Sequence, residues 1–427
     1  MIEHMITSLY LLGIFIYSYI INVIICSNEN KHYIYFINKA TETNMLFIKF
    51  MQWFSSNNME DEIKNLIRSF ADNVPYNNED IEYEQIDELI TIAQQQGKKL
   101  EINNRPINAG TIAIVYEGTL DNEKVILKQM RKNIEKELVD SIELMKFISY
   151  IASYMPYFKL FKLDEVITIN EKTLLHQVDF KKEIEHGKAF KRAFQDYEMV
   201  VIPHIYESIT LYHPNFILME KIIGRKVQEL GDEELEDYCN TYNNILVESL
   251  LKRGVVHADF HIGNIFFLEQ YKIGIIDFGN ILFIDDLLSK NISLFYKFLF
   301  NKQVKKLAKF IVEKTITYNN NIMIDHSDAE YISRKKIIID TICKLFEDDN
   351  LLSGKKPLNI HNILVINELL QKIDARMDDI FMNVIIAMGP MSSIVSILKR
   401  NDNNDSIKYV FLSHVHNRIP KCLKNYE

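Results

Sequence analysis

The chain has 427 residues, of which 48% are hydrophobic and 25% are charged. These proportions are typical of globular proteins and argue against wholesale disorder, a collagen-like repeat and a polytopic membrane protein. The formal net charge of −9 opposes a nucleic-acid groove, so we expect no nucleic-acid partner. The four cysteines are scattered and form no CxxC pair, which gives no support for a zinc site or a disulfide framework and fits a reducing compartment.

An apolar segment near the N-terminus predicts membrane association. Residues Ile6 to Cys26 are uncharged over 21 positions, which as a helix is long enough to cross a hydrocarbon core. Glu3 precedes the segment instead of a basic region, so an uncleaved anchor is preferred to a signal peptide. Lysines follow it, and the positive-inside bias places the bulk of the chain on the cytosolic side of a single-pass protein. A buried core helix or an interfacial helix is the alternative.

A helical stretch and then a β-rich stretch follow. Residues 40–100 read as helices joined by polar turns, because apolar positions such as Ile63, Leu66 and Phe70 recur at three- and four-residue spacing. Residues 107–130 contain two runs rich in β-branched residues, split by Asp121-Asn122. That pattern predicts a β-hairpin.

The rest of the chain alternates between the two kinds of pattern. We expect helices over 172–196, 232–253 and 287–400, short strands in VVIPHIY, in FILMEKIIG and within 255–280, and a polar tail after 400. The apolar stretch from Ile380 to Leu398 contains Gly389-Pro390 and several polar residues, and we interpret it as a packed helix pair, with a second membrane span as the alternative.

The segment over residues 254–280 carries the clearest chemical signal. In it Asp259 is followed five residues later by Asn264, and Asp277 comes eighteen residues after Asp259 in an Asp-Phe-Gly tripeptide. Phosphoryl transfer from ATP needs a carboxylate to orient the nucleophile, and an amide and a second carboxylate to hold Mg²⁺. This is the spacing of a kinase catalytic loop and its metal-binding aspartate. We expect Asp259 to be catalytic and Asn264 and Asp277 to bind the metal.

A kinase also needs a lysine on an upstream strand and a helix carboxylate that positions it. Lys128 follows the hairpin at the right place, in the run VILK. Glu183 is the best partner because it lies beside an apolar helical stripe, whereas Glu185 lies two residues further round the helix. A solvated strand lysine is the plain alternative for Lys128.

Two further segments are candidates for binding the nucleotide. Before Lys128 the chain has NAGTIA, in which Ala109, Gly110 and Thr111 would turn over the phosphates, with Val115 on the following strand. One glycine replaces the three of a protein kinase loop, so the amide cradle must differ from the usual one. Met219-Glu220 closes a strand before Gly224 and is a plausible hinge beside the adenine, or else an ordinary strand end.

Taken together, these residues resemble the UbiB family of atypical kinases, also called aarF-domain-containing kinases. The family's catalytic loop HADPHPGN is similar to HADFHIGN at 257–264, and its V-A-V-K to VILK at 125–128. Its alanine-rich loop is echoed by PINAGTIA at 106–113, its helix motif E-x-D-Y-x-x-E-A by QVDFKKEI at 177–184, and its K-x-G-Q signature by FIKFMQ at 47–52.

The resemblance implies an α+β fold of the bilobal protein-kinase type. We expect a small β-rich lobe at 101–230, a helical lobe at 231–400, a helical extension at 40–100 that hinders protein substrates, an anchoring helix at 6–26 and a polar tail at 401–427. The resemblance further implies ATP and Mg²⁺ as cofactors, a role in ubiquinone or isoprenoid-lipid metabolism at a membrane, and membrane lipid or isoprenoid-lipid biosynthesis proteins as partners.

The chain departs from the family pattern at several positions. Met51 replaces the glycine of K-x-G-Q, so the extension cannot dock with the same close backbone approach. Gln177 replaces a glutamate, which removes a carboxylate and could change nucleotide choice or metal number. Phe260 and Ile262 replace both prolines of the catalytic loop, which leaves that loop less rigid.

The leading hypothesis is an atypical kinase or ATPase that depends on ATP and Mg²⁺, because Lys128, Glu183, Asp259, Asn264 and Asp277 are all present. The first alternative is a non-catalytic pseudokinase that binds nucleotide or lipid as a membrane scaffold. The second is a small-molecule phosphotransferase of the aminoglycoside or choline kinase type.

Overall fold

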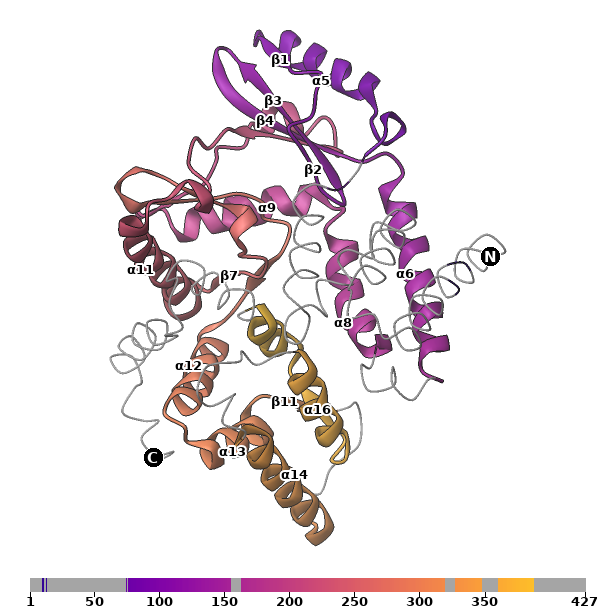
Figure 1. Ribbon diagram of the computed structural model, residues 1–427, viewed down its shortest axis with the longest axis vertical. Helices are drawn as coiled ribbons and strands as arrows, with labels where there is room; N and C mark the ends of the chain where they lie inside the picture. Colours follow the sequence, from indigo (N-terminus) through magenta and orange to yellow (C-terminus); the bar gives the residue numbers. More distant parts are fainter. Residues whose placement is uncertain are drawn as a thin grey trace, which may run out of the picture. The chain divides into compact units, whose positions relative to one another are not determined.

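The computed structural model describes residues 76–154, 163–318, 327–347 and 360–387, together with Tyr10, Gly13 and Val74. The chain divides into two compact units. Unit 1 comprises Met1–Ile184 and His204–Lys221, and unit 2 comprises Glu185–Pro203 and Ile222–Glu427. Both units combine strands with helices, so the predicted mixed α+β character is confirmed (Figure 1).

Unit 1 is built on a five-stranded sheet in the order β1-β3-β4-β6, with β2 paired to β3. The pairings are all antiparallel. The strands are β1 (Leu100–Ile102), β2 (Asn108–Ala109), β3 (Ala113–Leu120), β4 (Glu123–Met130) and β6 (Phe216–Glu220). The helical segments before and between them are η1 (Asn78–Asp80), α5 (Tyr83–Gln95), α6 (Ile134–Ala152), α8 (Leu163–His176), the first residues of α9 (Phe180–Ala193), and α10 (Glu207–Thr210).

The predicted hairpin is confirmed. Leu120 pairs with Glu123 across a two-residue turn, in which Asp121 and Asn122 both have positive φ, of 50° and 73°. Two such residues form the type of turn whose twist matches that of the flanking strands, and Asp and Asn tolerate it better than most residues. Gly118 lets β1 approach β3 closely, because a Cβ atom there would lie 2.3 Å from the carbonyl oxygen of Glu101.

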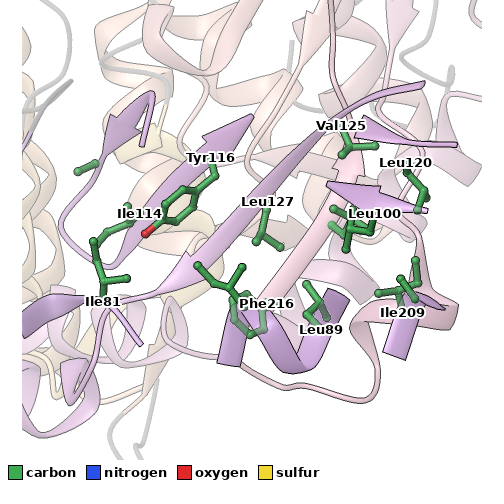
Figure 2. Packing of buried hydrophobic residues seen from close by; sticks show 14 residues of the cluster. Ile81, Leu89, Leu100, Ile114, Tyr116, Leu120, Val125, Leu127, Ile209 and Phe216 are labelled. Carbon is green, nitrogen blue, oxygen red and sulfur yellow. The ribbon is translucent and has the colours of Figure 1, made fainter. Parts of the chain in front are cut away.

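One face of this sheet carries the main core of unit 1. Buried side chains of β1, β3, β4 and β6 pack against Ile86, Leu89 and Ala93 of α5 and against Ile209 of α10 (Figure 2). Leu89, Leu127 and Phe216 lie at the centre of this cluster and have no exposed surface. Burial of a side chain of this size stabilises a fold by about 1.5–3 kcal/mol, so this contact fixes α5 on the sheet.

The opposite face of the sheet packs against the start of α9. Phe180 and Ile184 of α9 contact Ile217 and Met219 of β6 in a second buried cluster. We predicted one helix over 172–196, but the structure has two, α8 and α9. Asp179 causes the break, because its side chain accepts a hydrogen bond from the backbone N–H of Lys182 and so caps a new helix.

The sequence patterns did not predict α6 and the first part of α8. These two helices pack against each other through a small apolar cluster that includes Leu138, Ile142 and Leu174 (Figure 1). They lie in the chain between β4 and α9, and the sequence patterns predict no element over residues 131–171.

Unit 2 contains three small sheets and most of the remaining helices. A three-stranded sheet has the order β5-β9-β8, and the pairs β7 with β10 and β11 with β12 are antiparallel. The strands are β5 (Val200–Val201), β7 (Val255–His257), β8 (Ile265–Phe267), β9 (Ile273–Ile275), β10 (Ile281–Phe283), β11 (Ile316–Tyr318) and β12 (Ala375–Met377). The helical segments are the rest of α9, η2 (Val227–Glu229), α11 (Asp232–Glu248), η3 (Ser249–Arg253), η4 (Ile262–Asn264), η5 (Glu269–Tyr271), α12 (Asp286–Phe300), α13 (Val304–Lys314), α14 (Ala329–Glu347) and α16 (Ile360–Gln371).

Most expected elements of unit 2 are confirmed. The helix predicted over 232–253 corresponds to α11 and its continuation η3, which ends at Gly254 with φ of 67°, a conformation that favours glycine. The short strands predicted within 255–280 are β7, β8 and β9. The region 287–400 is not purely helical as expected, because β11 and β12 pair within it. Pairing between segments about 60 residues apart leaves no local periodic signal, which is why the pattern missed it.

Several predictions lie outside the described residues. These are most of the segment from Ile6 to Cys26, of which only Tyr10 and Gly13 are described, and residues 40–73 of the expected helical stretch, with the K-x-G-Q-like element at 47–52. The region after residue 387, which includes the second half of the expected helix pair, is also outside. Among the helices that the structure describes, none has the length and apolar character needed to cross a membrane.

Removal of one buried hydroxyl should stabilise unit 1. Tyr116 is fully buried, and its hydroxyl has no hydrogen-bond partner within the described ranges. We expect Tyr116→Phe to raise the free energy of unfolding by about 1 kcal/mol, because a buried polar group without a partner is costly. Thermal unfolding measures the change. Tyr206→Phe is the control and should be destabilising, since the Tyr206 hydroxyl donates to Glu123 at 2.9 Å. A lower Tm for Tyr116→Phe would contradict the prediction.

Candidate functional site

The first group of candidate residues lies in unit 1 and centres on an ion pair. Lys128 donates hydrogen bonds to Glu183 from Nζ, at 2.7 Å to Oε1 and 2.8 Å to Oε2. The two side chains are only 14% and 5% exposed. The Lys128 ammonium also lies 5.3 Å from the centre of the Phe180 ring. The structure therefore brings together the lysine and the carboxylate that the sequence paired.

Strand alternation and helix capping explain this arrangement. Leu127 and Gln129 point into the core beneath α5, so Lys128 between them points to the other face of the sheet, where α9 begins. Glu183 is in the first turn of α9, one residue before the buried Ile184. Glu185, the other candidate carboxylate, is exposed to solvent.

The predicted phosphate loop is the turn between β2 and β3. Ala109 is fully buried and Thr111 is 7% exposed, and the Gly110 N–H donates to the Ala113 carbonyl at 2.8 Å. Val115 lies directly across the strand pair from Lys128. The four residues expected to contact the nucleotide here therefore lie on β2, on β3 and in the turn between them, close to the end of β4 that bears Lys128.

The predicted hinge residues end strand β6. Met219 is buried in the cluster that includes Phe180 and Ile184. Glu220 is exposed, its N–H donates to the His204 carbonyl at 2.8 Å, and its carboxylate accepts from the His204 N–H at 3.1 Å. The Glu220 amide is thus engaged within unit 1.

The second group lies in unit 2 and contains Asp259, Asn264 and Asp277. The Asn264 side-chain amide donates to the Asp259 carbonyl at 3.0 Å, and the Ile276 N–H donates to the Asn264 carbonyl at 3.0 Å. These two hydrogen bonds connect Asn264 to Asp259 and to Ile276, the residue before Asp277, although Asp259 and Asp277 are eighteen positions apart.

His257 holds the two aspartate segments together. Its Nδ1 accepts a hydrogen bond from the Asp259 N–H at 3.3 Å, and its Nε2 lies 2.6 Å from the Asp277 carbonyl oxygen. Because Nδ1 accepts, the ring proton is on Nε2, which donates to Asp277. The ring is 2% exposed, and this burial lowers the pKa of His257 below its ordinary value, which favours the neutral ring that this pattern needs.

Asp277 has an uncommon backbone conformation. Its φ is 66°, in the left-handed region that non-glycine residues seldom adopt, and its Oδ1 accepts from the Gly279 N–H at 3.1 Å. Strain of this kind tends to be retained where the direction of a functional side chain matters. The bonds from His257 and Gly279 keep the residue in this conformation.

A buried aromatic residue restrains the catalytic loop. Phe260, which stands where the resembled family has proline, is 2% exposed and stacks on Tyr242 of α11 with ring centres 4.7 Å apart. The Tyr242 hydroxyl donates to the Phe260 carbonyl at 3.0 Å. Packing therefore supplies a restraint on this loop that the sequence comparison did not anticipate.

Three neighbouring side chains were not among the predicted site residues. The His261 Nε2 lies 3.7 Å from an Asp259 carboxylate oxygen, and the His186 Nδ1 lies 3.2 Å from the Phe278 carbonyl. Lys226 donates to the carbonyls of residues 263 and 265, on either side of Asn264, at 3.1 and 3.5 Å. His261 could have been found from the motif itself, whereas His186 and Lys226 reach the loop only through folding.

The donor atoms of this cluster suit a hard divalent cation. Since the Asn264 side-chain nitrogen bonds the Asp259 carbonyl, its Oδ1 is the atom available for a ligand, and Asp277 adds a carboxylate. Mg²⁺ prefers such oxygen donors, and it is commonly held by one or two protein side chains together with phosphate oxygens and water. The described residues contain no group of three or more His, Cys, Asp or Glu side chains fit to hold a metal alone. Asn264 and Asp277 therefore fit Mg²⁺ bound together with a nucleotide.

Comparisons with known proteins connect both groups to one family. Residues 69–311, more than half of the chain, match the model of the ABC1 atypical kinase-like domain. An uncharacterized chloroplastic aarF domain-containing protein kinase of Arabidopsis thaliana is 27% identical over 210 residues, which cover 45% of this chain and 38% of that protein. A probable protein kinase UbiB of Glaesserella parasuis is 28% identical over 153 residues, which cover 34% of this chain and 28% of that protein.

The chain thus spans less than half the length of these curated relatives. Among solved structures, one of a Mycobacterium tuberculosis protein in complex with erythromycin aligns with 83% of this chain and 87% of its own, at 16% identity and a TM-score of 0.46.

Loss of the carboxylate at position 183 should destabilise unit 1. We expect Glu183→Gln to lower the free energy of unfolding by about 3 kcal/mol, because a neutral amide replaces the carboxylate that pairs with the largely buried Lys128 ammonium. Urea unfolding measures this. Glu185→Gln, two positions along the same helix and exposed, is the matched control and should change stability by less than about 0.5 kcal/mol. Equal effects of the two substitutions would contradict the assignment of Glu183 as the counter-ion of Lys128.

The restraint on the catalytic loop can be tested through Tyr242. Tyr242→Phe keeps the stacked ring and deletes the hydroxyl that bonds the Phe260 carbonyl. We expect a loss of about 1–2 kcal/mol in unfolding free energy. We also expect faster amide hydrogen exchange over residues 259–264, measured by mass spectrometry. Unchanged exchange in these residues would mean that the Tyr242 hydroxyl does not hold the loop.

Proposed function

Because the chain belongs to the ABC1 atypical kinase-like family, we propose that it is a phosphotransferase or ATPase that uses ATP and Mg²⁺. The observation that carries the proposal is that Asn264 bonds the Asp259 carbonyl, while the His257 ring bonds the backbones of both Asp259 and Asp277 in unit 2. A base, an amide and a second carboxylate, held together in this order, are what phosphoryl transfer requires of a protein.

Each residue has a proposed part in the reaction. Lys128, positioned by Glu183, would bind phosphate oxygens, and its charge would offset the charge that develops on the transferred group. Asn264 and Asp277 would hold Mg²⁺, which neutralises phosphate charge when bound. Asp259 would orient the attacking hydroxyl or water and accept its proton.

His257 would contribute as a positioning residue. Its neutral ring donates to the Asp277 carbonyl and accepts from the Asp259 amide, so it fixes the backbone of the metal-binding and the catalytic aspartate at once. His261, beside the Asp259 carboxylate, is placed to affect the direction of that carboxylate.

The proposed metabolic role and membrane location come from the resemblance. Several relatives carry the name probable protein kinase UbiB, and we extend the proposal to a role in ubiquinone or other isoprenoid-lipid metabolism at a membrane. The membrane anchor at 6–26, the cytosolic orientation and lipid-biosynthesis partners remain predictions from the sequence.

The proposal predicts that nucleotide binding and turnover depend on Asp277. With the full chain, Mg-ATP at about 100 times its dissociation constant should stabilise the fold by about 2.7 kcal/mol in a thermal shift experiment. Asp277→Asn should abolish both the Mg²⁺-dependent part of this shift and ATP turnover, because the variant loses a carboxylate that holds the metal. Asp286→Asn, an exposed aspartate in the first turn of α12, is the control and should behave like the wild type.

Three results would point elsewhere. Turnover undiminished in Asp277→Asn would overturn the assignment of the metal site. No shift of the wild type with any nucleotide would favour the scaffold hypothesis. Phosphate transfer to a defined soluble alcohol would favour a small-molecule phosphotransferase.

A further inference from the structure

The buried side chain of Arg131 connects three separate parts of unit 1. It follows β4 directly, three residues after Lys128, and is only 2% exposed. Its Nε donates to the Gly110 carbonyl at 3.0 Å, one terminal nitrogen donates to the Asp80 carboxylate at 2.8 Å, and the other donates to the Val74 carbonyl at 3.3 Å. The guanidinium thus bonds both the predicted phosphate loop and the segment of Val74 and Asp80 that precedes α5.

Backbone hydrogen bonds run alongside these contacts. The Arg131 N–H donates to the Ile112 carbonyl at 2.9 Å, the Val74 N–H to the Ala109 carbonyl at 2.7 Å, and the Lys132 N–H to the Asp80 carbonyl at 2.9 Å. The loop over residues 109–112 is therefore attached both to the end of β4 and to residues 74–80.

These bonds determine which way the loop amides point. The described chain contains no cis peptide bond, and in a trans peptide the N–H of one residue points opposite to the carbonyl of the residue before it. Arg131 binds the carbonyls of Gly110 and Ile112. The N–H groups of Thr111 and Ala113 therefore point away from Arg131.

A phosphate-binding loop presents backbone amides whose directions are fixed before the ligand binds. Protein kinases obtain a suitable loop from several glycines. Here the loop has one glycine, Gly110, and the buried Arg131 guanidinium donates a hydrogen bond to the Gly110 carbonyl. A lysine could not do this, because a single ammonium lacks the planar fork that reaches three acceptors at once.

We propose that Arg131 is a positioning residue that orients the loop over residues 109–112 for nucleotide binding, and that through it the segment of Val74 and Asp80 regulates nucleotide affinity. This inference rests on the proposed function, because it concerns the same nucleotide. It adds a dependence of the loop on the Asp80 carboxylate, which lies about 30 positions upstream and before α5.

Nucleotide titrations of full-length variants provide the first test. Arg131→Lys keeps the charge but loses the fork, and it should raise the dissociation constant for Mg-ATP on the order of tenfold. Asp80→Asn should raise it in the same direction by about threefold. The effects should not add in the double variant, since both substitutions act on one contact.

Hydrogen exchange without nucleotide provides the second test and does not depend on the proposed function. In both single variants the amides of residues 109–113 should exchange on the order of tenfold faster than in the wild type. Leu120→Ala is the control, because Leu120 is buried at the opposite end of the hairpin and its loss destabilises unit 1 without touching the loop. It should leave both the dissociation constant and the loop exchange close to wild type.

The outcomes separate the two claims. A wild type that binds no Mg-ATP, with loop exchange still accelerated in the variants, would overturn the proposed function but leave the support of the loop by Arg131 intact. Nucleotide binding and loop exchange unchanged in Arg131→Lys and Asp80→Asn would overturn this inference alone. If Leu120→Ala changes the dissociation constant and the loop exchange as much as Arg131→Lys does, Arg131 only stabilises unit 1 in general. That result would also overturn this inference. If Arg131→Lys does not fold, Asp80→Asn still decides.

Discussion

The burial of the Lys128 charge near the end of strand β4 constrains how α9 packs in unit 1. An ammonium that is 14% exposed is tolerated only with a counter-ion at hydrogen-bond distance, and Glu183 meets that demand. To place Glu183 there, α9 must begin at a particular residue and lie against a particular face of the sheet. The cap by Asp179 and the packing of Phe180 and Ile184 satisfy both conditions. One electrostatic requirement thus fixes the position of a helix.

The constraint in unit 2 is different, because its candidate residues are polar and their side chains must be held in fixed directions. It does so with backbone hydrogen bonds, and His257 is central because one ring binds both aspartate segments. Side chains from other elements then bind the loop carbonyls, as Lys226 and Tyr242 do. The stacking of Phe260 on Tyr242 supplies apolar packing beside the cluster, and hydrogen bonds orient its polar groups.

Much of this could be predicted from the sequence, and the limits have physical causes. The hairpin followed from Asp121-Asn122, and the candidate metal and base residues followed from their spacing, because both signals are local. The break before α9 was missed because no glycine or proline separates the two helices, and only the Asp179 cap marks it. Arg131 was missed because its partners lie about 20 to 60 residues away in the chain, and no spacing reports such contacts.

Phe260 stands where the resembled family has proline, and this replacement changes how the backbone of the catalytic loop is restrained. A proline limits its own backbone torsion and keeps that limit even when its surroundings loosen. A buried ring gives no such intrinsic limit, and it restrains the loop only while Tyr242 and the rest of α11 remain folded beneath it. Order in this loop is therefore cooperative with the hydrophobic interior of unit 2. A local opening of α11, far smaller than global unfolding, would be enough to release the loop.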